Sequence, residues 1–139
     1  MKRFEFFEHT ADIGVIAYGK TLKQAFANTA YGMFSILVGN LKQVNLSKTV
    51  DIEVKGNDLQ EILVAFLSEL LYNHTVGNLI LKKFSIKEMT DTSLKAKASG
   101  EGYDPDCHEL LHEIKTVTYH QLKIEEKEGY FRIQVIFDI

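Results

Sequence analysis

The spacing of apolar residues switches between two periods along this chain, and this switching constrains the fold more than any other feature. Apolar residues recur every three or four positions in two segments, which predicts two amphipathic helices. One stripe runs from Leu22 to Leu37 and the other from Leu59 to Leu71, with Gly39 and Gly77 expected beyond the helix ends. A capping pattern that begins at Thr21 predicts the start of the first helix.

The remaining segments alternate apolar and polar residues or form short apolar runs, as β-strands do. Strands are expected at residues 3–8, 13–19, 50–54, 79–86, 94–100, 117–126 and 130–138. This order predicts an α+β fold in which two helices pack on mostly antiparallel sheet. Residues 48–103 follow the order strand, helix, strand, strand, and the outer parts repeat it. We therefore predict one strand-helix-strand-strand unit inserted into another, within a single domain of residues 1–139.

The amino-acid composition limits the classes of function that this protein can have. The net charge of −3 gives no global basic field for DNA or RNA, so we expect RNA to be involved only indirectly, through a protein partner. A single cysteine, Cys107, excludes an internal disulfide and suits a reducing compartment. No apolar run approaches the ~18 residues of a membrane span, and no signal peptide is recognisable. These features predict a cytoplasmic protein without membrane or DNA partners.

A polar block at residues 8–14 separates the first two predicted strands, and Asp138 stands next to last in an apolar final strand. Loops held by strands often carry binding residues, and carboxylate oxygens suit calcium or magnesium. His9, Asp12 and Asp138 are therefore candidates for a divalent-cation site, to which Ile139 would add its main-chain carboxylate. The spacing equally fits two unrelated surface aspartates, and both interpretations stay open at this level.

A second candidate is the formal zinc motif His108-Glu109-Leu110-Leu111-His112. On a helix this spacing would place two imidazoles on one face, as in zinc-dependent hydrolases. The context is unfavourable, because strand-forming residues follow and the extended zinc motif is absent. We keep a zinc hydrolase as the enzyme alternative.

A third candidate is a lysine-bearing sheet face, which would be either a solvated surface or a docking surface for RNA or an acidic partner. Its members are Lys82, Lys83, Lys87, Lys95 and Lys97. The sequence has no glycine-rich phosphate loop and no serine nucleophile motif, so nothing in it indicates a self-sufficient enzyme.

Taken together, these motifs resemble the archease family. The resemblance rests on His9-Thr10-Ala11-Asp12 near the start and Asp138-Ile139 at the end. Between them lie further matching blocks at residues 56–59, 69–72, 100–108 and 114–120, in the expected order.

The resemblance implies a non-enzymatic protein cofactor that activates the GTP-dependent RNA ligase of the RtcB type in tRNA splicing and RNA repair. Such a cofactor promotes guanylylation of the ligase histidine and multiple turnover. A softer version is a chaperone-like modulator of RNA-modifying enzymes. The resemblance also implies a calcium or magnesium site formed by Asp12, Asp138 and Ile139. Further partner-facing or supporting residues would be Glu8, His9, Asp104, His108, Lys115 and His120.

Overall fold

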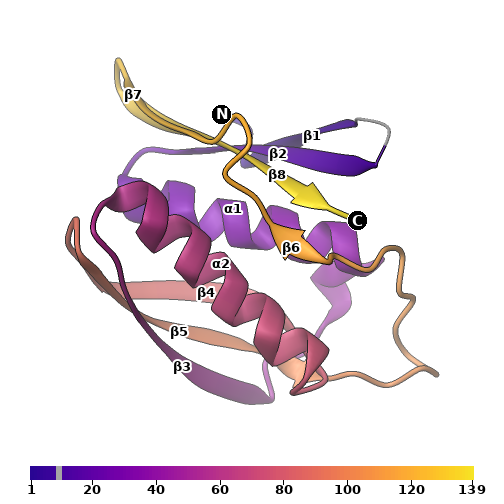
Figure 1. Cartoon of the computed structure of the whole chain (residues 1–139). Helices are drawn as coiled ribbons and strands as arrows, with labels where there is room; N and C mark the ends of the chain where they lie inside the picture. Colours follow the sequence, from indigo (N-terminus) through magenta and orange to yellow (C-terminus); the bar gives the residue numbers. More distant parts are fainter. Residues whose placement is uncertain (9–10) are drawn as a thin grey trace.

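The structure, a computed structural model, describes residues 1–8 and 11–139 and places two helices between two antiparallel sheets (Figure 1). The elements follow in the order β1 (Phe4–Glu8), β2 (Asp12–Gly19), α1 (Leu22–Leu37), a short 3₁₀ helix η1 (Leu41–Gln43), β3 (Lys48–Lys55), α2 (Leu59–Thr75), β4 (Leu79–Met89), β5 (Ser93–Gly102), β6 (Thr116–Val117), β7 (Lys123–Lys127) and β8 (Tyr130–Asp138).

The sheet topology confirms the predicted α+β fold and the nesting of one unit in the other. One sheet has the order β1-β2-β8-β6, with β7 also paired to β8, and is built from the outer parts of the chain. The other sheet has the order β3-β5-β4 and comes wholly from residues 48–102. The chain therefore leaves the first sheet after β2, builds the second sheet, and returns to complete the first.

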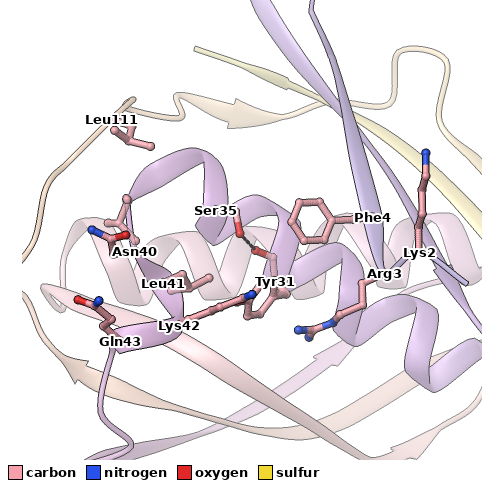
Figure 2. Close-up of a pocket in the computed structure, with 12 residues that line it drawn as sticks. Lys2, Arg3, Phe4, Tyr31, Ser35, Asn40, Leu41, Lys42, Gln43 and Leu111 are labelled. Atoms are coloured by element: carbon pink, nitrogen blue, oxygen red, sulfur yellow. Dashed lines mark hydrogen bonds between the residues drawn. The ribbon is translucent and has the colours of Figure 1, made fainter.

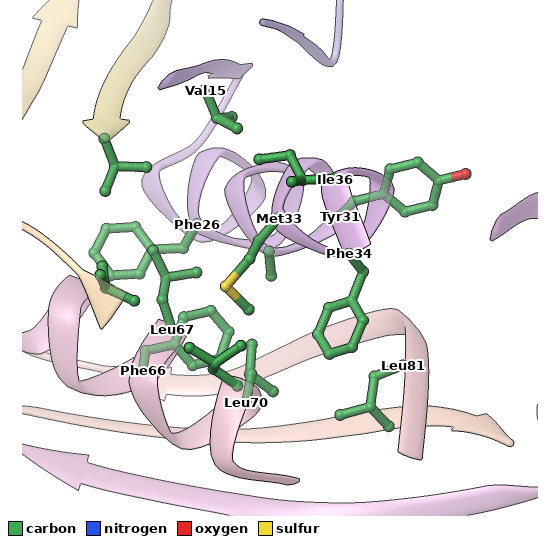
Figure 3. Close-up of a cluster of buried hydrophobic side chains, with 14 of the residues drawn as sticks. Val15, Phe26, Tyr31, Met33, Phe34, Ile36, Phe66, Leu67, Leu70 and Leu81 are labelled. Carbon is green, nitrogen blue, oxygen red and sulfur yellow. The ribbon is translucent and has the colours of Figure 1, made fainter. Parts of the chain in front are cut away.

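Both helices begin at capping residues and bury the predicted apolar stripes. The hydroxyl oxygen of Thr21 accepts a hydrogen bond from the main-chain N–H of Gln24, and Asp58 caps α2 in the same way. Phe26 of α1 and Phe66 of α2 stack with their ring centroids 6.3 Å apart, in a layer that side chains from both sheets join (Figure 3). Among the described residues, no helix has the length and apolar character needed to cross a membrane.

The predicted strand at residues 117–126 is wrong, because the structure divides this segment into β6, a turn, and β7. Gln121 adopts a left-handed conformation, with φ of 53°, which a continuous strand does not allow. Its carbonyl accepts a hydrogen bond from the side chain of Gln134 on β8, which fixes the turn. The pairing of β4 with β5 is irregular at one place near its start, where the register shifts between Leu81 and Lys83.

The helix layer yields a first test. Phe66 is fully buried, so Phe66→Ala would leave a cavity and should lower the free energy of unfolding by about 3–5 kcal/mol in urea denaturation. Tyr72→Ala lies on the same helix at a position that is 57% exposed, and we expect it to cost far less. Equal losses for the two variants would show that the layer between the sheets does not dominate stability.

Candidate functional site

The register of β2 and β8 brings the two predicted aspartates together. Asp12 lies directly opposite Asp138 in this antiparallel pair. Opposed residues project to the same face, with Cβ atoms about 4.5–5.5 Å apart. The next pair in register, Ile13 and Phe137, is buried in the core, so alternation directs both carboxylates to the other face of the sheet. Asp138 is exposed, and the Oδ1 atom of Asp12 is buried.

Three segments of main chain converge on these aspartates. The N–H of Lys115 donates to the carbonyl of Asp138 at 2.7 Å, and Thr116 pairs with Asp138 from the other edge of β8. The N–H of Ile139 points to the carbonyl of Ala11 at 3.4 Å. The aspartates are therefore carried by paired backbone.

This donor set favours a hard cation over zinc. Two carboxylates held opposite one another repel unless a cation, a proton or a hydrogen-bond donor lies between them. Among residues 1–8 and 11–139, no group of three or more His, Cys, Asp or Glu side chains is arranged to hold a metal. The two carboxylates would thus need main-chain or water oxygens to complete a shell, which calcium and magnesium accept and structural zinc does not.

An aromatic ring covers the strand beside Asp12. Phe7 of β1 lies opposite Gly14 of β2, and a methyl group at Gly14 would overlap the Phe7 ring. Only glycine allows this close approach. Sequence reasoning did not assign a role to this pair, although a glycine amid strand-forming residues is the signal for it.

The other predicted partner-facing residues lie at different distances from this end of the sheet. Glu8 is exposed at the end of β1 and pairs with Ile13, next to Asp12. Lys115 is exposed and joins the site through its main chain. His120 lies in the turn before β7, where its N–H donates to the Thr118 hydroxyl. His9 lies outside the described residues.

His108 belongs to a separate arrangement, which we call the loop clasp: Asn45, Glu101, Tyr103, Asp104 and His108. The Nδ1 atom of His108 accepts the main-chain N–H of Asp104 at 2.8 Å, so the ring proton is assigned to Nε2. Nε2 then donates to Glu101, 3.0 Å away. Glu101 also accepts the N–H of Asn45, and the His108 ring stacks on Tyr103.

The clasp has a clear electrostatic signature. The hydrogen bond from His108 is the main cause that holds the pKa of the Glu101 carboxyl below its ordinary value, and the contacts with Asn45 act in the same direction. Nearby, Asp104 accepts a hydrogen bond from the Cys107 thiol and raises the pKa of that thiol. The Cys107 thiol therefore forms its thiolate less readily than a free cysteine, which is the opposite of an activated nucleophile.

The zinc-hydrolase interpretation is wrong for this structure. Residues 108–112 are not helical, so the spacing does not put two imidazoles on one face. Both ring nitrogens of His108 are engaged in the clasp, and His112 is exposed. The segment is extended because Leu110 bridges to Val38, which ties it to the end of α1.

Most of the predicted lysine face is present on the outer side of the three-stranded sheet, and Lys82 is the exception among its members. Lys97 pairs with Asp51 at 2.8 Å and Lys95 with Glu88 at 3.6 Å, so the outer face of the three-stranded sheet mixes charges. Lys82 instead donates from Nζ to two main-chain carbonyls beside η1. Lys83 lies opposite Ser99 and so shares the outer face with Lys95 and Lys97. On the edge strand it also lines a hollow together with Lys82 and Arg3.

Sequence comparison finds close relatives over the full length of the chain. A family model described as the archease protein family matches residues 4–139. A Pyrococcus furiosus protein named protein archease is 42% identical, with 100% of both chains covered. Its namesake from Methanosarcina mazei is 39% identical, with 99% of this chain and 97% of that protein covered.

Solved structures show the same fold. A solution structure of Methanobacterium thermoautotrophicum protein 1598 superposes with a TM-score of 0.84 at 34% identity, covering 100% of both chains. A Thermotoga maritima crystal structure, described as an archease and possible chaperone, superposes with a TM-score of 0.62 at 20% identity. The superposition covers 96% of this chain and 94% of that one, and at this identity it supports only the similarity of fold.

The loop clasp predicts a pH-dependent contribution to stability. Because the pKa of Glu101 is lowered on folding, its charged form stabilises the fold above the ordinary glutamate pKa of about 4.3. This contribution is lost as pH falls through the lowered pKa. Wild type should thus be more stable than Glu101→Gln at neutral pH, and urea denaturation should show the difference shrinking in acid. Glu109→Gln, an exposed change in the same loop, should show no such trend.

Proposed function

The chain belongs to the archease family, and on that premise we propose that it is a non-enzymatic protein cofactor of the GTP-dependent RNA ligase of the RtcB type. In this role it promotes guanylylation of the ligase histidine and lets the ligase turn over repeatedly, in tRNA splicing and RNA repair. The coarser description of a Thermotoga relative as a possible chaperone is compatible with a protein that assists another protein.

The observation that carries the proposal is the direct opposition of Asp12 and Asp138. We infer that their carboxylates, with main-chain oxygen from Ile139, would hold a divalent cation, most suitably calcium or magnesium. When bound, the cation would supply positive charge between the two facing carboxylates. We call the end of the sheet that carries Asp12 and Asp138 the acidic end. Because both aspartates lie on paired strands, the acidic end is already ordered before a partner binds.

A protein cofactor changes the activity of a partner only by binding two of the partner's states unequally. In this proposal the acidic end, with its cation, binds best to the ligase state that is competent for guanylylation. Glu8 and Lys115 flank the aspartates and would contact the ligase there. The loop clasp would act indirectly, because it fixes the segment that leads into β6.

Cation binding should be measurable without a ligase. A cation that binds only the folded protein raises its melting temperature. Calcium or magnesium should therefore stabilise wild type, and Asp138→Asn should abolish most of this rise. In a chelator, Asp138→Asn should be at least as stable as wild type, because one of two repelling charges is gone. The exposed Asp91→Asn is a matched control, and an unchanged cation response in Asp138→Asn would refute the site.

Ligation with substoichiometric protein tests the function itself. A cognate ligase with GTP and divalent metal should pass from about one turnover to many when wild-type protein is added. Asp138→Ala should lose this stimulation while keeping its melting temperature in chelator, and Asp91→Ala should keep it. No stimulation by wild type would refute the cofactor proposal, and full stimulation by Asp138→Ala would refute the acidic end as its working part.

A further inference from the structure

Two adjoining hollows lie between the N-terminal segment, α1, η1 and β4, away from the paired aspartates. Their volumes are about 820 and 390 Å³, and both are lined by Arg3, Tyr31 and Lys42. The smaller hollow adds Lys82 and Lys83. Figure 2 shows the Lys42 side chain extending along the larger hollow toward Tyr31, where the Arg3 guanidinium also lies. We call this continuous surface the basic groove.

The charge of the basic groove is one-sided, although the protein as a whole is acidic. No Asp or Glu is among the residues that line either hollow. Across the described part of the chain, neither Lys42 nor Lys83 forms an ion pair with a carboxylate, whereas Lys95 and Lys97 on the outer sheet face do. Lys2 at the rim of the larger hollow pairs with Glu5, but Lys42 and Lys83 leave positive charge in the groove that no described carboxylate pairs with, and this potential would attract anions.

Arg3 is held in a fixed orientation at the centre of the groove. Its guanidinium carbon lies 3.9 Å from the centroid of the Tyr31 ring, and its Nε donates to the side chain of Asn28 at 3.0 Å. Tyr31 is only 8% exposed, so the ring is a rigid base for the stack. No side chain among the described residues forms an ion pair with the terminal guanidinium nitrogens of Arg3, and a preorganised fork of this kind suits the oxygens of a phosphate.

Lys82 fixes the far wall of the groove. Its Nζ donates to the carbonyls of Lys42 and Val44, at 2.7 and 2.6 Å, which ties the η1 segment to β4. The main chain that carries Lys42 is thus anchored, and the charge of Lys82 adds to the potential between Lys42 and Lys83. The groove has two fixed cations, Arg3 and Lys82, and exposed lysines that include Lys42 and Lys83.

We propose that the basic groove binds the phosphodiester backbone of single-stranded RNA. Lysines and arginine would contact successive phosphates, and the Arg3–Tyr31 stack offers a planar surface on which an unpaired base can lie. An acidic peptide would meet the charge requirement alone and would make no use of that stack. The choice of RNA over DNA rests on the proposed function, and direct contact would replace the indirect role expected from net charge.

The test uses the full chain, without ligase, and fluorescence anisotropy of a labelled oligouridylate over a range of salt concentrations. One triple variant, Arg3→Gln/Lys42→Gln/Lys83→Gln, removes charges from the groove. A matched triple, Lys87→Gln/Lys95→Gln/Lys97→Gln, removes as many charges from the outer sheet face. Thermal unfolding of both variants establishes that each is folded.

We expect the groove triple to bind at least ~10-fold more weakly than wild type at low salt. Its salt slope should fall by about 0.7 for each phosphate that the variant no longer neutralises. The matched triple should stay within about twofold of wild type. Arg3→Lys, which keeps the charge and removes the stack, should give an intermediate affinity.

Three outcomes would overturn the proposal: no RNA binding by wild type at low salt, equal losses in the two triples, or displacement of the RNA by polyglutamate at equal charge concentration. The last would identify the occupant as an acidic protein segment. Because no ligase is present, these outcomes leave the cofactor proposal standing. If wild type binds RNA but fails to stimulate the ligase, only the cofactor proposal is refuted.

Discussion

The structure depends on α1 being packed on both sides. The helix lies against β2 of one sheet and β4 of the other, and each contact requires a particular residue pair. A methyl group at Gly32 would lie 2.8 Å from a Val15 methyl, so the helix approaches β2 as closely as glycine permits. On the other side, Phe34 packs on Phe84 with ring centroids 5.8 Å apart. This helix sets the spacing of the two sheets, and through β2 it determines where Asp12 lies.

The apolar periodicity predicted the helices well because the apolar residues that define the pattern are the ones that pack in the core. All six stripe residues of α2 from Ile62 to Leu71 are buried, as expected. The turn at Gln121 could not be read from local sequence, because a side chain thirteen positions away, Gln134, holds it. Similarly, the zinc motif failed because a β-bridge to Val38 imposes an extended backbone on residues that fit a helical spacing.

In the candidate site, too, some features can be predicted from local sequence and others depend on distant residues. Residue type and position drew attention to Asp12 and Asp138, but their pairing is a matter of strand register, which spacing alone does not fix. The family resemblance supplied what periodicity lacked. The basic groove escaped prediction for a different reason. Arg3 and Lys42 are far apart in sequence, and only the packing of the N-terminal segment against Tyr31 brings their charges onto one surface.

The nested topology has a consequence for how the molecule is assembled during synthesis. The three-stranded sheet comes from one continuous segment, residues 48–102, so all its strand pairs can form once that segment has been synthesised. The pairing of β2 with β8 spans nearly the whole chain, and closing so long a loop is slow and entropically costly. Asp12 can face Asp138 only after β8 has been synthesised and has paired with β2. The acidic end therefore exists only in molecules in which β2 and β8 have paired.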